Sequence, residues 1–180
     1  MRYFWVYFLL FGFVLCTPTL EAQHLKVQSN QEFGSAEEDV VRAIDVHASG
    51  LYLVGDTMGV VDSGSSSGDR DVFVMKYDVE GHVVWTHQFG SGRADFGRAI
   101  DVEEDTVVIG VEASDAAFLR KYRLDGRTLW TAPIFGRAND KIHDIDIDGT
   151  SIFVAGEAAS KDAAKSGKGR VREEARWLWD

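Results

Sequence analysis

The sequence has 180 residues, 45% of them apolar, with 19 Lys and Arg against 29 Asp and Glu and a formal net charge of −10 at pH 7. A chain of this length and apolar content is long enough to fold around a buried core. The acidic balance argues against nucleic acid as a partner, because the phosphate backbone is bound through Lys and Arg. We expect the negative charge to serve solubility.

The N-terminus has the pattern of a secretory signal peptide. A single Arg precedes an almost wholly apolar stretch, Tyr3 to Cys16, and the sequence TPTLEA follows it. This pattern predicts a signal peptide over residues 1–22, cut after Ala22, and a secreted or cell-envelope location. The apolar stretch is too short for a comfortable membrane span. An uncleaved anchor is the alternative, and it is the only membrane contact that we expect.

Cleavage after Ala22 would remove Cys16, the one cysteine of the sequence. Disulfides, thiol chemistry and thiolate metal sites would then be excluded from the exported chain. Residues 23–32 are polar and are expected to form a linker. The alternative for this segment is a strand that pairs with the last sheet of a closed ring.

Three stretches of the sequence open with Phe-Gly and continue alike: FGSAEEDVVRAIDV, FGSGRADFGRAIDV and the looser FGRANDKIHDIDI. Fixed periods in this range indicate a repeat architecture. The first period is longer, 56 against 46 residues, and the extra length lies in the loop-like stretch GVVDSGSSSGDRD. The recurring positions are Phe33, Gly34, Gly55, Tyr77, Gly81 and Trp85 in the first copy, Phe89, Gly90, Gly110, Tyr122, Gly126 and Trp130 in the second, and Phe135, Gly136 and Gly156 in the third.

Each full copy is predicted to form four short strands separated by turn signals. In the first copy they are Val41–Val46, Leu51–Gly55, Val72–Tyr77 and Val83–Gln88; in the second they are Ala99–Val102, Thr106–Val111, Ala117–Tyr122 and Thr128–Thr131. Gly81 and Gly126 supply the positive φ that a short hairpin turn with a bulge requires. Runs such as LYLV and VFVM are apolar at every position, which indicates sheets covered on both faces.

The expected fold is therefore an all-β, incomplete β-propeller of four-stranded antiparallel blades, since such sheets stacked around an axis are propeller blades. Blade 1 spans residues 33–88, blade 2 spans 89–134, and a partial blade 3 spans 135–157. After Gly156 the pattern fails, and residues 158–180 are expected to form a charged, irregular or helical tail. A bound helix, a disordered tail or a gene model that ends in the wrong place would explain the break, and we favour the last.

The pattern FG…D…AIDV…G…F…KY…G…W-T, from Phe33 to Gly156, resembles the bacterial SBBP-type β-propeller repeat. That resemblance implies an extracellular or envelope propeller, from a family mostly without an assigned activity. Asp45 and Asp101 depart from the pattern, because they stand where a small residue is expected.

A second, weaker similarity is to quinoprotein propeller repeats, which end a hairpin with Asp-x-x-Gly-x-x-x-Trp. Asp78, Gly81 and Trp85 have this spacing, but Arg123 replaces the Asp in the second copy. Under either resemblance Trp85 and its counterpart Trp130 are expected to pack between blades.

The stretch DIDIDG matches the start of a calcium-binding loop, D-x-D-x-D-G. The twelfth position of that loop should be a bidentate Glu, but here it is Ala155. The same stretch aligns with the first strand of the earlier copies, where carboxylates two residues apart share a face. Asp144, Asp146 and Asp148 are thus weak calcium candidates, and a solvated strand edge is the favoured interpretation.

Other motifs favour structural interpretations. Gly64 to Gly68 spells G-x-S-x-G, but a nucleophile elbow needs a buried strand before it and a helix after it, and a Ser/Gly-rich loop surrounds this one. Asp39, Asp95 and Asp140 recur after each Phe-Gly, and bonding to backbone donors of the turn is favoured over a cation-binding ring. The histidines occupy unmatched positions, so none is assigned a role.

The sequence predicts a secreted or surface-exposed binding or structural module, part of a longer propeller. No catalytic residue or cofactor is assigned, so an enzyme is less favoured. The alternative is part of a propeller enzyme, quinoprotein-like or carbohydrate-active, with its catalytic residues outside this chain. A truncated gene product with no independent role is a third hypothesis. The partner is unknown, and either further blades or self-association would cover the sheet face and edges that an open stack exposes.

Overall fold

A computed structural model describes residues 32–62, 64–135, 140–157 and 169–172 of the chain. The chain divides into two compact units, Met1–Asn30 and Gln31–Asp180, and every described residue belongs to the second. The predicted signal peptide, the linker apart from Glu32, the repeat position Gly136 and most of the tail lie outside the described residues.

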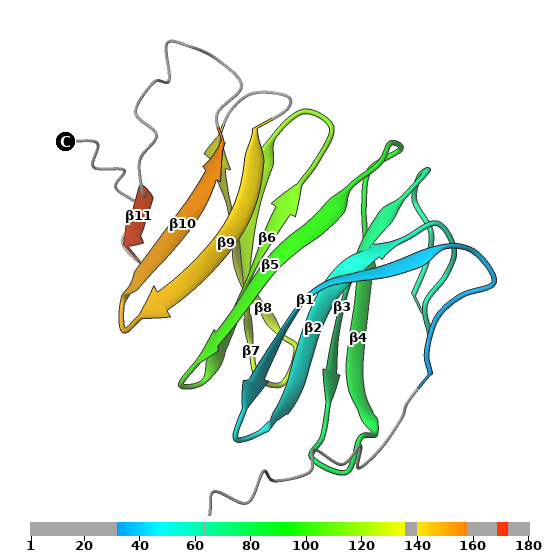
Figure 1. Cartoon of the computed structure of the whole chain (residues 1–180), viewed down its shortest axis with the longest axis horizontal. Helices are drawn as coiled ribbons and strands as arrows, with labels where there is room; N and C mark the ends of the chain where they lie inside the picture. Colours follow the sequence, from blue (N-terminus) through cyan, green and yellow to red (C-terminus); the bar gives the residue numbers. More distant parts are fainter. Residues whose placement is uncertain (1–31, 63, 136–139, 158–168, 173–180) are drawn as a thin grey trace, which may run out of the picture. The chain divides into compact units, whose positions relative to one another are not determined.

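The described residues form antiparallel sheets and no helix (Figure 1). Sheet 1 consists of β1 (Asp39–His47), β2 (Gly50–Thr57), β3 (Asp71–Tyr77) and β4 (Val83–Phe89). Sheet 2 consists of β5 (Phe96–Glu103), β6 (Thr106–Glu112), β7 (Ala117–Arg123) and β8 (Thr128–Phe135). Sheet 3 consists of β9 (Lys141–Asp148) and β10 (Ser151–Glu157), with the short β11 (Gly169–Arg172), from the region predicted as a tail, beside β10. The predicted all-β class is confirmed, and so are the eight predicted strands.

The hairpin turns that close sheets 1 and 2 depend on glycine. Gly81 has φ 91° and Gly126 has φ 87°, which only glycine adopts without strain. Their N–H groups donate to the carbonyl oxygens of Asp78 and Arg123, and the strand register shifts by one residue just before each turn. The predicted turn with a bulge is therefore confirmed in both copies.

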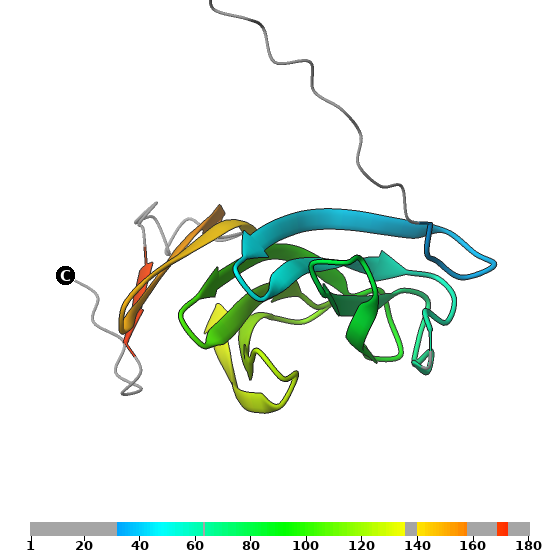
Figure 2. The ribbon, with the colours of Figure 1, turned by 90° about the horizontal axis from the view of Figure 1, so that it is seen from below.

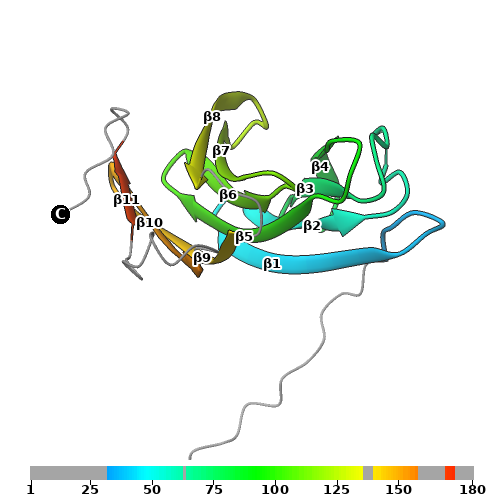
Figure 3. The same cartoon turned by 90° about the horizontal axis from the view of Figure 1, so that it is seen from above.

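The sheets pack face to face. Sheets 1 and 2 enclose one apolar cluster, which includes Tyr52, Val54, Val72, Val74, Ile100, Val107, Ile109, Val111 and Tyr122. Sheets 2 and 3 enclose another, which includes Ala99, Val108, Ala117, Leu119, Ile134, Ile142, Ile145, Ile147, Ile152 and Val154. The first strands of the three sheets, β1, β5 and β9, lie in order beside one another (Figures 2 and 3). All seven residues of β3 are buried, which confirms that its sheet is covered on both faces.

The pairing register corrects one sequence equivalence. Gly55 pairs with Val41, whereas Gly110 pairs with Ala99, one step further along the strand. The two glycines therefore face opposite sides of their sheets, although their residue type suggested a match. The 56-residue period makes Val54, not Gly55, the counterpart of Gly110. Gly110 faces sheet 3, where a Cβ would come within 2.9 Å of Ile142 and Ile145. Close packing of the sheets requires glycine there.

The loop between β2 and β3, which carries the extra length of the first copy, covers the outer face of sheet 1. Val61 of this loop is 1% exposed and packs in a cluster with Leu53, Phe73, Met75 and Tyr77. Gln88 of β4 holds the loop, since its Oε1 accepts the Val61 N–H at 2.9 Å and its Nε2 donates to the Gly59 carbonyl at 2.8 Å. Terminal repeats in a stack need such a cover, so we call this loop the cap.

We expect Val61→Ala to lower the free energy of unfolding by about 1–3 kcal/mol, because it removes buried methyl groups over an apolar sheet face. Urea unfolding followed by circular dichroism measures the change. Val79→Ala is the matched control: Val79 is 75% exposed, and its truncation should change stability by less than about 0.5 kcal/mol. Equal effects of the two substitutions would show that the cap is not part of the core.

Candidate functional site

One aspartate in each sheet occupies the same register position. Asp45 pairs with Tyr52, Asp101 with Val108, and Asp146 with Phe153, in each case across the first hairpin of the sheet. The sequence analysis noted Asp45 and Asp101 only as departures from the repeat pattern. Their recurrence in AIDV, AIDV and DIDI was the available signal of a shared role.

The first two of these aspartates join neighbouring sheets. Asp45 Oδ2 accepts the backbone N–H of Val102 in sheet 2 at 2.7 Å, and Asp101 Oδ2 accepts that of Ile147 in sheet 3. Val102 and Ile147 each follow the aspartate of their own sheet. The same carboxylate-to-amide link is therefore made twice, always from one sheet to the next.

A second polar pair also recurs in each sheet. Its basic residue stands at the irregularity in the first strand, and its carboxylate lies near the end of the second strand, 14 residues later in every copy. The pairs are Arg42–Asp56 at 2.7 Å, Arg98–Glu112 at 2.7 Å and His143–Glu157 at 3.2 Å. Sequence reasoning missed these pairs because the residue types differ between copies, although the constant spacing was a usable signal.

Each of these carboxylates has a further partner besides the basic residue at the bulge. Glu112 also accepts the N–H of Ile142 in sheet 3 at 2.8 Å, so it forms a further link between sheets. Glu157 is exposed in sheet 3, and hydrogen bonds from His143 and, to a smaller extent, from Lys141 lower its pKa. Asp56 is fully buried and is also bound by Arg70, a residue of the cap.

The outer strand β4 docks on the last hairpin of sheet 2. Trp85 Nε1 donates to the Leu124 carbonyl at 2.9 Å, and His87 Nε2 donates to the Gly126 carbonyl at 2.7 Å. The His87 ring also stacks on Tyr122, with 5.4 Å between ring centroids. Trp85 thus packs between sheets 1 and 2, as predicted, and the role of His87 is one that sequence reasoning missed.

Trp130, the register counterpart of Trp85, packs against the cluster between sheets 2 and 3. Its predicted place between two sheets is confirmed. Each junction between neighbouring sheets therefore contains an aspartate link and a tryptophan.

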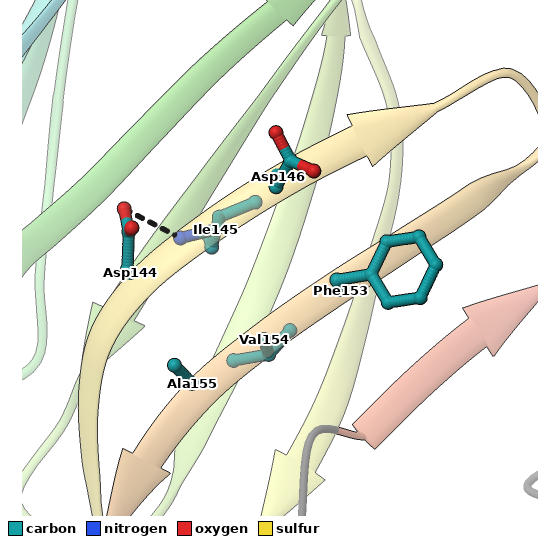
Figure 4. Close-up of a pocket in the computed structure, with 6 residues that line it drawn as sticks. All are labelled: Asp144, Ile145, Asp146, Phe153, Val154 and Ala155. Carbon is teal, nitrogen blue, oxygen red and sulfur yellow. Dashed lines mark hydrogen bonds between the residues drawn. The ribbon is translucent and has the colours of Figure 1, made fainter.

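On the outer face of sheet 3 the corresponding aspartate makes no link to a further described sheet. Asp144, Asp146, Phe153 and Ala155 share one face of β9 and β10, and we call them the end face. Together with Ile145 and Val154 they line a hollow of about 380 Å³ (Figure 4). Both aspartates are exposed, and Asp144 Oδ1 accepts the N–H of Ile145 at 3.0 Å. The opposite face of β9 is buried against sheet 2.

The calcium candidates Asp144, Asp146 and Asp148 all lie on the extended strand β9. Alternate residues of a strand stand about 6.6 Å apart, whereas Ca²⁺ holds each ligand oxygen at about 2.3–2.6 Å and takes most of its ligands from a folded loop. Within the described residues, no group of three or more His, Cys, Asp or Glu side chains is placed to hold a metal ion.

The recurring aspartates before each first strand have the predicted turn role in two copies. Asp39 and Asp95 accept the backbone N–H groups of Ser35 and Ser91. Asp140 is buried at the corresponding place before β9. The G-x-S-x-G motif lies in the cap, and in the part of the chain that the structure describes no helix follows it.

The comparisons with known proteins leave the family of this chain open. No protein-family model matches the sequence, and no curated protein matches it. Over the ranges with described coordinates, no helix has the length and apolar character to cross a membrane. The SBBP-type resemblance therefore stays a prediction.

The environment of Asp101 gives a pH-dependent prediction. Burial raises its pKa, the hydrogen bond from Ile147 opposes this rise, and the nearby Asp45 adds to it. We expect Asp101→Asn to keep the link, since the amide oxygen accepts an N–H, while it removes the buried charge. Because the folded-state pKa is raised, the wild type should lose stability relative to the Asn variant as pH rises from about 3.9, the pKa of an unfolded Asp, through the raised value.

Urea unfolding of the wild type and the variant at several pH values between about 3.5 and 7 tests this prediction. Asp115→Asn, on the exposed turn between β6 and β7, controls for the loss of a charge. If the wild type instead gained stability relative to the Asn variant with rising pH, the pKa of Asp101 would not be raised in the folded protein.

Proposed function

We propose that this chain is an exported protein of stacked, propeller-type blades that acts as a binding or structural module. The observation that carries the proposal is the junction made twice in succession, from sheet 1 to sheet 2 and from sheet 2 to sheet 3. Such a junction supports growth of the stack by addition of like sheets. The end face, with its exposed aspartates, is the surface that this arrangement leaves for a partner.

The contacts of the buried and half-buried polar side chains also favour a binding or structural module over an enzyme. Asp45, Asp101 and Glu112 bind backbone N–H groups of a neighbouring sheet, and Asp56 is held by two arginines. His87 is bound to a backbone carbonyl and stacked on a tyrosine. These side chains, which catalysis often employs, are engaged here in joining and supporting sheets.

Export is part of this proposal, and a fusion experiment tests it. Residues 1–32 are joined to a bacterial alkaline phosphatase that lacks its own signal and becomes active only outside the cytoplasm. We expect strong phosphatase activity and a mature product that begins at residue 23, because residues 1–22 have the pattern of a signal peptide. The control fusion carries residues 23–32 alone and should be inactive. Equal activity of the two fusions would refute export.

A further inference from the structure

The two outer faces of the described stack carry complementary halves of a junction: sheet 3 exposes an aspartate, and sheet 1 exposes an apolar stripe. At one end, the aspartate of sheet 3, Asp146, is exposed on the end face. It has the register position of Asp45 and Asp101, each of which accepts an N–H from the following sheet. The end face therefore has the acceptor of a junction, on the side where a following sheet would lie.

At the other end, β1 presents an apolar stripe. Val41, Ile44 and Val46 are 42%, 61% and 74% exposed. Their register counterparts in β9 are Ile142, Ile145 and Ile147, which are 2%, 5% and 8% exposed because they pack on sheet 2. The stripe of β1 thus has the chemistry of a junction surface, and among the residues that the structure describes no sheet lies in front of it.

We propose that the end face of one copy of this chain binds the β1 stripe of a second copy, head to tail, with Asp146 accepting the N–H of Val46. This proposal names the partner for the binding role proposed above and does not depend on export. Joining unlike ends in this way gives a ring if the rotation closes and a filament if it does not.

The backbone N–H of Val46 is suited to this contact. It donates to Asp45 Oδ1 of its own sheet at 2.7 Å. Val102 is the counterpart of Val46 in sheet 2. Its N–H donates to Asp45 of sheet 1 and also contacts the carboxylate of Asp101, the aspartate of sheet 2. A local contact of this kind is thus compatible with a second acceptor from another sheet. Asp146 of a second copy would take the place that Asp45 has at Val102.

Charge and shape favour unlike ends over like ends. Two end faces in contact would bring Asp144 and Asp146 of both copies together, and like charges facing each other destabilise a contact. The cap covers the β2 to β4 side of sheet 1 and leaves the β1 stripe exposed. The end face lies on β9 and β10, with β11 beside β10. On sheet 1, Met58 and Val60 of the cap are exposed as well as the stripe.

Analytical ultracentrifugation of the purified protein, whether or not residues 1–22 are removed in the cell, tests the proposal. The average mass of the wild type should rise with concentration to at least twice that of the monomer. Asp146→Lys blocks the end face and Val46→Lys blocks the stripe, and each should weaken association at least about tenfold, since each puts a charge into an apolar or acceptor position. Both side chains are exposed in the single chain, so melting curves should confirm that the variants fold.

Mixing the two variants gives the sharpest outcome. The Asp146→Lys chain keeps an intact stripe and the Val46→Lys chain keeps an intact end face, so an equimolar mixture should form dimers that do not grow. Glu80→Lys, on the exposed β3–β4 turn, is the matched charge control and should associate as the wild type does. A wild type that stays monomeric at every concentration, a blocked variant that still associates alone, or a mixture without dimers would each overturn the proposal.

Discussion

The strands in the middle of these sheets carry apolar side chains on both faces, and this constraint governs the rest of the structure. Every residue of β3 is buried, with one face against sheet 2 and the other under the cap. Burial of apolar surface is the main favourable term in folding, so a sheet of this composition is unstable unless both faces are covered. Sheet 2 lies between two neighbours, and sheet 1 lies between one neighbour and its own loop. Sheet 3 differs, since aspartates occupy its outer face.

Apolar contact between sheets has no preferred direction, and the polar links supply one. Asp45 and Asp101 bind the N–H of the residue that follows the aspartate in the next sheet, which fixes how far one first strand can slide along another. Glu112 adds a second link at the other end of the strand, through Ile142. Burial raises the pKa of Asp101, so its charge is held at an energetic cost, and the hydrogen bond that it accepts offsets part of this cost.

Sequence reasoning located the strands because their signals are local. Alternation of apolar runs with Gly turns placed Val72–Tyr77 within one residue of β3, and Gly81 and Gly126 adopt the positive φ that their turns predicted. The polar contacts between sheets are not local, so they were missed, whereas the recurring Trp85 and Trp130 were correctly expected to pack between sheets. The role of Asp45 depends on which sheet lies opposite it. The false match of Gly55 with Gly110 arose because the two glycines were paired by residue type, although the 56-residue period and the pairing register both make Val54 the counterpart of Gly110. The cap was recognised as a loop, but its composition gave no sign that Val61 is buried.

We expect the carboxylate links to hold the first strands of neighbouring sheets in one cooperative structure. Native-state hydrogen exchange at the backbone N–H groups of Val102 and Ile147 tests this claim most directly, because within their own sheets these groups face the open edge of the first strand. We expect both N–H groups to exchange only with an opening free energy close to that of global unfolding. Asp45→Ala should lower the protection of the Val102 N–H more than that of the Ile147 N–H. Exchange of both groups at the rate of unprotected amides in the wild type would contradict it.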